Sequence, residues 1–288
     1  MRRYIIIIGA MKSGTTTLFD VLAQHPEIAP SWDKEPGFFA FEDIHDRGYD
    51  WFDGMFNFDP DRHQYRLEAT TDYTKAPFVT GVWERMTARD DVEVKLIYIM
   101  RHPLRRIESH ARHTERTRRE IGRNDSARPS HSLEAGLSPV SLAASAYATQ
   151  LKPYQGAWEA GHLHCLTLED LKTDPEPTLA ALWAFLDLAP PQSKLSLTPK
   201  NVAGTKMRTH PLWKRLMAIK PLLTLVKLVL PKAARDRISD RFRRQVHVVE
   251  GRFTLTDAEE ACLSDLYASD LADLRDRYGI DTKRVWQL

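Results

Sequence analysis

The run Ile5-Ile6-Ile7-Ile8-Gly9, with the turn and helix-forming stretch after it, constrains the fold of this chain most strongly. Four consecutive β-branched residues predict a strand that is buried on both faces, as in a parallel sheet. Backbone N–H groups of a glycine-containing turn and of a helix amino terminus bind anions. The sequence therefore predicts a strand–loop–helix unit that holds an anionic group over residues 11–17, with hydroxyl donors from Thr15, Thr16 and Thr17.

The position of the lysine separates this loop from the nucleotide triphosphate loop G-x-x-x-x-G-K-[ST], in which lysine follows the second glycine. Gly9 and Gly14 have the required spacing, but Thr15 occupies the lysine position and Lys12 lies inside the loop. The predicted strand over residues 94–100 ends in Arg101, where an NTPase places an acid that binds Mg²⁺. A cation there argues against Mg-nucleotide chemistry and predicts a further phosphate contact. A P-loop kinase or NTPase remains the alternative function for a chain with this loop.

Strands and helices alternate along the chain. Besides residues 5–8, strands are predicted at 65–68, 95–100 and 164–168, and helices at 16–24, 81–87, 104–113, 142–157 and 177–186. This alternation predicts an α/β fold of the P-loop-like type, with three layers and a central parallel sheet flanked by helices. The 288 residues are 42% hydrophobic and show no break in composition, so we expect one domain over residues 1–288.

Three segments fall outside this alternation. Residues 113–139 are charged with little apolar periodicity and predict a mobile loop, whose arginines either contact an anionic acceptor or form a solvated helix face. Residues 212–250 predict a helical excursion, in which 216–233 either touches lipid or a partner, or packs on the core. An apolar helical period and the capping-box pattern Thr256-Asp257-Ala258-Glu259 predict a carboxyl-terminal helix over residues 256–279.

Four motifs carry a resemblance to a known family. They are Lys12-Ser13-Gly14-Thr15-Thr16, for K-x-G-T-T; Lys34-Glu35-Pro36-Gly37-Phe38-Phe39, for K-E-x-x-F-F; Arg101 to Ser109, for R-x-P-x-x-R-x-x-S; and Lys206-Met207-Arg208-Thr209-His210-Pro211, for K-G-R-T-H-P. Their order over residues 5–211 resembles the sulfotransferases that use 3′-phosphoadenosine 5′-phosphosulfate (PAPS), above all the heparan-sulfate type and bacterial members. Met207 departs from the glycine of the late motif, and would strain that loop if its φ were positive.

The resemblance implies a PAPS-dependent sulfotransferase that releases 3′-phosphoadenosine 5′-phosphate (PAP) and needs no metal. The residues that it implies in donor binding are Lys12, Ser13, Gly14, Thr15, Thr16, Thr17, Arg101, Ser109, Lys206, Arg208 and Thr209. Transfer in line needs positioning, charge stabilisation and a proton acceptor. Lys12 is expected to stabilise the leaving phosphate oxygen and Glu35 to act as the general base, with His102 or His110 as the second choice.

The acceptor is predicted as a hydroxyl, less readily an amine, of a carbohydrate, lipid or other small molecule. Lys34, Phe38, Phe39 and Tyr73 are candidates to line its cleft, although such aromatics are more often core side chains. A non-catalytic nucleotide-binding or membrane-peripheral scaffold is the alternative from another class.

Arg101 directly follows a strand, so its guanidinium is expected at the carboxyl edge of the sheet, where ligands bind. Ser109 lies on the same side of the following helix as Arg105. The alternative for the arginines of this helix is a solvated basic face, and this is our interpretation for Arg106 and Arg112.

Charge and cysteine content set broader expectations. The net charge of +2 gives no support for nucleic acid as a partner. Cys165 and Cys262 are expected to be buried and reduced. The start Met1-Arg2-Arg3-Tyr4 leads straight into the first strand, which predicts no signal peptide and a cytoplasmic location. The sequence does not set the oligomeric state.

Overall fold

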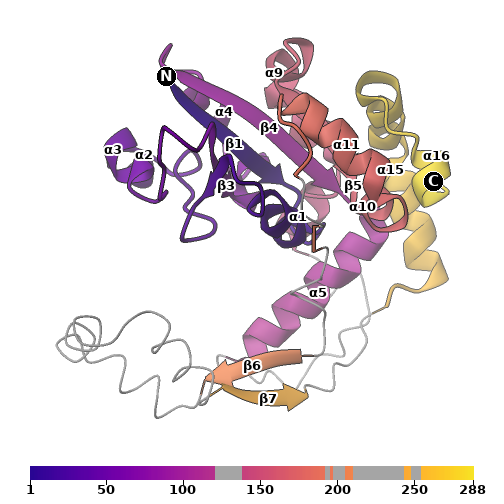
Figure 1. The fold of residues 1–288 in the computed structure, drawn as a ribbon. Helices are drawn as coiled ribbons and strands as arrows, with labels where there is room; N and C mark the ends of the chain where they lie inside the picture. The colour runs from indigo at the N-terminus through magenta and orange to yellow at the C-terminus, as the bar shows by residue number, and fades with distance from the viewer. Residues whose placement is uncertain (121–137, 192–194, 197–204, 210–242, 248–253) are drawn as a thin grey trace. The chain divides into compact units, whose positions relative to one another are not determined.

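The structure, a computed structural model, describes residues 1–120, 138–191, 195–196, 205–209, 243–247 and 254–288 (Figure 1). Contacts group the chain into two compact units, Met1–Thr198 with Phe253–Leu288, and Pro199–Arg252. The sequence predicts one domain, and each unit is described here by itself.

The first unit is built on a five-stranded parallel sheet in the order β2-β3-β1-β4-β5 (Figure 1). Its strands are β1 (Arg2–Gly9), β2 (Ile28–Pro30), β3 (Tyr65–Ala69), β4 (Val92–Met100) and β5 (Leu163–Thr167). The chain leaves β1 toward β2 and β3 on one side and then crosses to β4 on the other side. Ligands bind at the carboxyl ends of strands where the order reverses in this way, which places the expected site at the end of β1.

Alternate residues of β1 enter two separate cores, one on each face of the sheet. Ile5 and Ile7 pack with helices α1 (Thr15–Leu22), α10 (Leu168–Thr173) and α11 (Pro175–Phe185). Tyr4, Ile6 and Ile8 pack in the second core. Elements that contribute to the second core are α3 (Gly48–Asp53), η1 (Thr71–Thr74), α4 (Val82–Met86), α5 (Pro103–Glu120), α8 (Tyr147–Leu151), η2 (Lys152–Tyr154), α9 (Gln155–Glu159), α15 (Asp257–Tyr278) and α16 (Thr282–Trp286). The predicted three-layer α/β fold is confirmed, and the isoleucine run is explained by burial on both faces.

The helix predicted over residues 142–157 is wrong as a single element, because the chain forms α7 (Pro139–Ala143), α8, η2 and α9 there. Asp270 of α15 accepts hydrogen bonds from the N–H groups of Ala148 (3.0 Å) and Thr149 (2.8 Å), which satisfies the start of a new helix at α8. Pro153 cannot supply an N–H to continue the same helix. Tertiary capping thus divides a segment that is helical in its local pattern.

For two segments, residues 113–139 and 212–250, the structure differs in part from the prediction. Helix α5 continues to Glu120, so the loop prediction is wrong for residues 113–120, and residues 121–137 lie outside the described residues. Residues Arg243–His247 form strand β7, so the helical prediction is wrong there, and residues 210–242, with the proposed lipid-contacting stretch, lie outside the described residues.

In the second unit, β6 (Thr205–Thr209) pairs with β7 as an antiparallel ladder. Met207 lies opposite Gln245 within this ladder. Strand residues are extended, so the strain expected of methionine at a left-handed position does not arise here.

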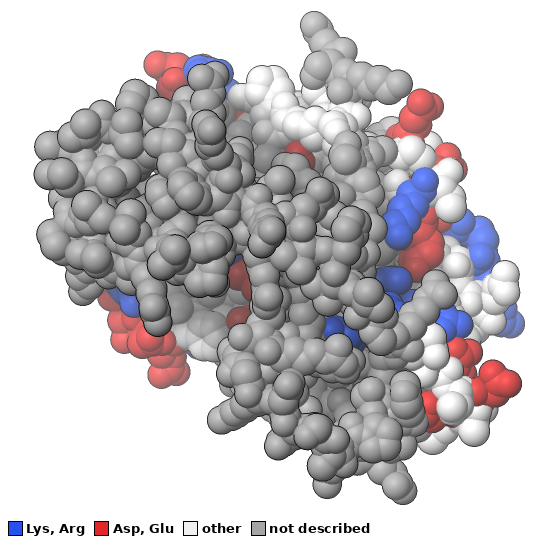
Figure 2. Space-filling model, turned by 90° about the horizontal axis from the view of Figure 1, so that it is seen from below, with Lys and Arg blue, Asp and Glu red and all other residues white. Residues whose placement is uncertain are grey.

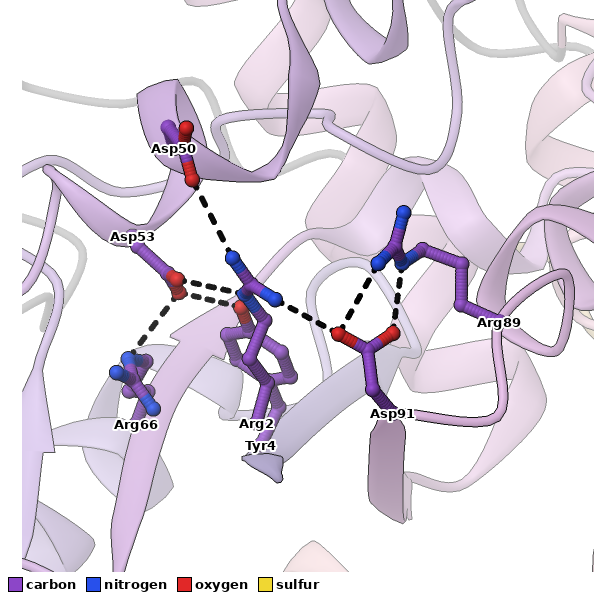
Figure 3. A network of polar contacts seen from close by, with 7 residues as sticks. All are labelled: Arg2, Tyr4, Asp50, Asp53, Arg66, Arg89 and Asp91. Carbon is purple, nitrogen blue, oxygen red and sulfur yellow. Dashed lines mark hydrogen bonds and ion pairs between the residues drawn. The ribbon is translucent and has the colours of Figure 1, made fainter.

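A polar network lies at the amino ends of the strands (Figure 3). This edge of the sheet is opposite the expected ligand site. Arg2 donates to Asp53 (2.9 Å) and Asp91 (2.8 Å), and Tyr4 also donates to Asp53. Arg66 joins Asp53 at 3.2 Å. Burial, followed by the Asp53 hydrogen bond, raises the pKa of Tyr4, so the phenol stays protonated and donates. The network ties β1, β3 and α3 together at one end.

On the face drawn in Figure 2, the visible basic and acidic side chains of the described residues are interspersed. No helix within the described ranges has the length and apolar character to cross a membrane. Both cysteines are free: Cys165 is partly buried, as expected, but Cys262 lies on the solvent side of α15, so its predicted burial is wrong.

The capping box of α15 is confirmed and gives a stability prediction. The N–H of Glu259 donates to Thr256 Oγ1 (3.3 Å), and the N–H of Thr256 donates to Glu259 Oε2 (2.8 Å). We expect Thr256→Ala to lower the free energy of unfolding by about 1 kcal/mol in urea denaturation, because a helix N–H loses its acceptor. Ser264→Ala, within the same helix, is the control, and an equal loss there would contradict the capping role.

Candidate functional site

The two loop glycines are required by close neighbours. Gly14 has φ +93°, and a Cβ on it would lie 2.6 Å from Leu168 Cδ1, just beyond β5. A Cβ on Gly9 would lie 2.1 Å from Thr74 Oγ1 of η1. The loop after β1 is therefore fitted closely between η1 and the end of β5, and neither glycine tolerates a side chain without displacement.

Lys12 and Glu35, the two predicted catalytic residues, both have a left-handed backbone, with φ of 70° and 54°. A non-glycine residue in this region costs roughly 1–2 kcal/mol, and such residues cluster at functional sites. Lys12 follows β1, and the N–H of Glu35 donates to the carbonyl of Ala69 at the end of β3 (3.0 Å). The structure therefore holds both residues at the carboxyl ends of two neighbouring strands.

The η1 turn connects these two strand ends. Thr71 Oγ1 donates to Glu35 Oε1 (3.3 Å), and Thr74 Oγ1 donates to the carbonyl of Ile8 (2.8 Å). Because one short turn contacts both the Glu35 carboxylate and the last residues of β1, the Glu35 side chain is oriented relative to the loop.

The predicted second phosphate contact begins where expected. Arg101 follows β4 directly, is half-buried, and its guanidinium forms no hydrogen bond or ion pair with the other described residues. Burial lowers the pKa of Arg101 and Glu169 opposes this, but an arginine remains charged in proteins. A half-buried cation of this kind is suited to an anionic ligand. Ser109 is half-buried on α5, and its contact with an anion stays a prediction.

Arg106 is not on a solvated face, so that interpretation is wrong. The side chain is fully buried; its Nε donates to Ser145 Oγ (2.6 Å), one terminal nitrogen reaches the carbonyl of Met11 (3.5 Å), and the other donates to the carbonyl and hydroxyl of Ser141. The guanidinium thus links the loop after β1 to α7. The missed signal was helical phase, because Arg106 lies three residues after buried Pro103 and so shares its face, whereas Arg105 is exposed.

Tyr147 supports the start of the second motif, and Ser13 of the loop lies near it. Ser13 is fully buried, and its hydroxyl forms no hydrogen bond with the other described residues. The Tyr147 hydroxyl donates to the carbonyl of Arg101 (2.7 Å). Burial raises the pKa of Tyr147 to about 12, so this donor persists at neutral pH. Ser13 is thus a buried residue of the loop, while Thr16 and Thr17 remain part-exposed at the first turn of α1.

The two histidines considered as bases differ in surroundings. Burial, together with Arg106, Lys12, His113 and Lys75, lowers the pKa of His110 to about 4. His110 is therefore neutral at pH 7 and within the electrostatic reach of Lys12, so it stays the second candidate base. Burial also lowers the pKa of His102, whose backbone N–H donates to Glu169 (3.0 Å).

Three residues predicted to line the acceptor cleft are core side chains instead. Phe38 and Phe39 are fully buried and Tyr73 is nearly so, and the Phe38 ring stacks on Phe52 with centroids 4.3 Å apart. Rings packed in the core in this way present no open face, so the structure gives no support to their predicted contact with an acceptor. Lys34 is half-buried with its ammonium over the Phe19 ring (4.6 Å), and its role stays a prediction.

An open cavity of about 480 Å³ lies along the segment after Phe39. Phe41 (40% exposed) and Phe78 (52% exposed) present aromatic surface there, and Glu42, Asp43 and Arg85 add polar groups. Exposed rings with nearby hydrogen-bonding groups can bind a small ligand or a sugar ring.

Three further predicted residues belong to the second unit. Lys206, Arg208 and Thr209 lie on β6 of the second unit, so their place in donor binding stays a prediction. Across the described part of the chain, no three His, Cys, Asp or Glu side chains group as metal ligands would.

Sequence reasoning gave no role to Glu68, at the end of β3. Its carboxyl is fully buried, and burial raises its pKa to about 8. The sequence signal for this burial is that Glu68 lies between two apolar residues at the end of the strand.

Comparison with known proteins gives a family. The model of the family described as "Sulfotransferase domain" matches residues 2–220. Human heparan sulfate glucosamine 3-O-sulfotransferase 5 is 24% identical over 72% of this chain and 64% of its own length. Mouse heparan sulfate glucosamine 3-O-sulfotransferase 6 is 30% identical over 64% of this chain and 52% of its own length. The chain thus spans less than two thirds of the length of these curated relatives.

A solved structure supports the fold. The sulfotransferase from Alicyclobacillus acidocaldarius superposes with a TM-score of 0.53 at 23% identity, covering 82% of this chain and 99% of its own. This likeness agrees with the parallel sheet and flanking helices described above.

The buried guanidinium gives a stability prediction. We expect Arg106→Ala to lower the free energy of unfolding by about 3 kcal/mol, because buried hydroxyl and carbonyl groups lose their donor and a void remains. Arg105→Ala is the matched control: Arg105 is 45% exposed and pairs with Glu108 and Glu260, so its loss should cost less than about 1 kcal/mol in the same denaturation measurement. Equal costs would contradict the structural role of Arg106.

Proposed function

Because this chain belongs to the sulfotransferase domain family, we propose that it transfers the sulfuryl group of PAPS to a hydroxyl, less readily an amine, of a carbohydrate, lipid or other small-molecule acceptor. One observation carries the proposal: Lys12 and Glu35, both left-handed, are held at the ends of neighbouring strands β1 and β3. This is the arrangement that a leaving-group cation and a proton acceptor on opposite sides of a transferring group would need.

In the proposed reaction, the acceptor oxygen attacks sulfur in line, an O–S bond forms, and the bond from sulfur to the 5′-phosphate oxygen breaks. Lys12 and the amino terminus of α1 stabilise the charge that develops on that oxygen. Glu35 takes the acceptor proton, and the Thr71 hydroxyl orients its carboxylate. Arg101 and Ser109 contact the 3′-phosphate, and PAP leaves as product.

The side chains that line the cavity along residues 40–43 bear on which class of acceptor could bind there. Phe41 and Phe78 offer ring faces to an apolar or sugar surface, while Glu42 and Asp43 disfavour a densely anionic chain. We therefore favour a neutral or weakly charged alcohol over a polysulfated one. The alternative, a P-loop kinase or NTPase, lacks support because Thr15 stands in the lysine position and Arg101 in that of the metal-binding acid.

Donor binding provides the first test. Isothermal calorimetry should detect PAP with an affinity that is unchanged by Mg²⁺ or by chelator, and binding to Arg101→Ala should weaken by ~10–100-fold through loss of a charged phosphate contact. Arg105→Ala should bind as the wild type does. Binding of ATP with Mg²⁺ in place of PAP would instead support the kinase alternative.

The choice of base provides the second test. We expect Glu35→Gln to lower kcat for transfer from ³⁵S-labelled PAPS by ~10²–10⁴-fold, because the amide cannot accept the proton, while PAP affinity is retained. His110→Asn is the matched variant and should retain most of kcat. The reverse ranking would transfer the base assignment to His110.

A further inference from the structure

Glu68 is a buried acid that the proposed reaction does not use directly. It lies at the carboxyl end of β3, opposite Ile6 of β1, and its side chain is fully buried. Oε2 accepts a hydrogen bond from Thr70 Oγ1 (2.9 Å), whereas Oε1 is buried with no hydrogen-bond partner among the described residues. A carboxylate in such a place would carry a large desolvation cost, so the presence of an acid there needs a reason.

The hydrogen bonds around Glu68 lead to the segment that carries Glu35. Thr70 Oγ1, which donates to Glu68, accepts from the N–H of Gly37 (3.2 Å). The Tyr73 hydroxyl, whose neighbourhood lowers the pKa of Glu68, accepts from the N–H of Phe39 (3.3 Å). Two amides just after the left-handed Glu35 are thus held by side chains, and one of these, Thr70, is itself oriented by Glu68.

We propose that Glu68 is a positioning residue, which acts through Thr70 to fix the segment that carries the Glu35 carboxylate at the transfer site. The consequence for catalysis rests on the proposed function of Glu35. The Glu68 carboxyl does not itself touch the acceptor or the donor, because it is fully buried beneath this segment.

The charge state of Glu68 makes this anchor sensitive to pH. Burial, and to a lesser extent the Glu35 carboxylate, raises the pKa of Glu68 to about 8, although Tyr73 and the hydrogen bond from Thr70 oppose the shift. No basic side chain in the described ranges acts on this pKa; Arg66, on the same face of β3, pairs with Asp53 at 3.2 Å. Glu68 is therefore neutral at pH 7.

Ionisation above pH 8 would place a second negative charge near Glu35 within the core, so the anchored segment should loosen. The raised pKa of Glu68 also makes the stability of the folded protein depend on pH. An unfolded glutamate ionises near pH 4.5 and folded Glu68 near pH 8, so its contribution is complete below pH 4.5 and is lost as pH rises toward 8.

Hydrogen exchange on the full-length protein tests the anchor without any need for activity. In wild type, peptides covering residues 35–41 should lose roughly tenfold protection between pH 7 and pH 9, after correction for intrinsic exchange, because Glu68 becomes mostly ionised. Glu68→Gln, which has the same shape and stays neutral, should keep its protection. Peptides from α15 serve as the internal reference, and Thr70→Val should loosen residues 35–41 at both pH values.

Transfer kinetics provide the second arm. The kcat of wild type should fall above about pH 8, while that of Glu68→Gln should persist to higher pH and stay within about threefold of wild type at pH 7. Identical pH dependence of exchange in the two proteins would overturn the proposal. So would loss of transfer in Glu68→Gln with unchanged exchange, since Glu68 would then take part in the chemistry. A difference in exchange with no sulfuryl transfer by either protein would leave the anchor standing and remove the proposed function.

Discussion

The buried guanidinium of Arg106 is the interaction on which the geometry of the candidate site depends. It reaches the carbonyl of Met11 in the loop after β1 and the polar groups of Ser141 and Ser145, and no acid of the described residues forms an ion pair with it. Burial lowers its pKa and the surrounding tyrosines raise it, and the charge persists. A buried cation satisfied by carbonyl and hydroxyl oxygens is costly to disturb, so loop, α5 and α7 keep one relative position.

The same site stores strain where the chemistry is expected. Lys12 and Glu35 both adopt the left-handed conformation, and each is held by its surroundings: Lys12 by a loop closed between Thr74 and Leu168, and Glu35 by the Ala69 carbonyl and Thr71. Such conformations persist only where neighbouring structure over-determines them. At the opposite edge, the polar network of Arg2 and Asp53 ties β1, β3 and α3 together (Figure 3).

Local patterns predicted much of this fold. The isoleucine run, the two loop glycines, the strand before Arg101 and the capping box at Thr256 each appear as expected, because each is set by residues close in sequence. The division of residues 139–159 into short helices was missed, because it depends on Asp270, more than a hundred positions away. The local pattern does not decide the burial of Phe38 and Phe39, since an aromatic beside a candidate base can pack inward, as it does here, or face a ligand.

The sequence alone determined the type of fold and the position of the glycine-containing loop after β1, because spacing and periodicity act within one strand–loop–helix unit. It also supplied Lys12, Glu35 and Arg101 as candidates. Only the tertiary structure decided which side chains turn inward: Arg106 anchors the loop, Ser13 lies against Tyr147, and Glu68 is buried and neutral behind Glu35. The physical reason is that burial and the partners of a polar group come from elements distant in sequence, and these set both its charge state and its orientation.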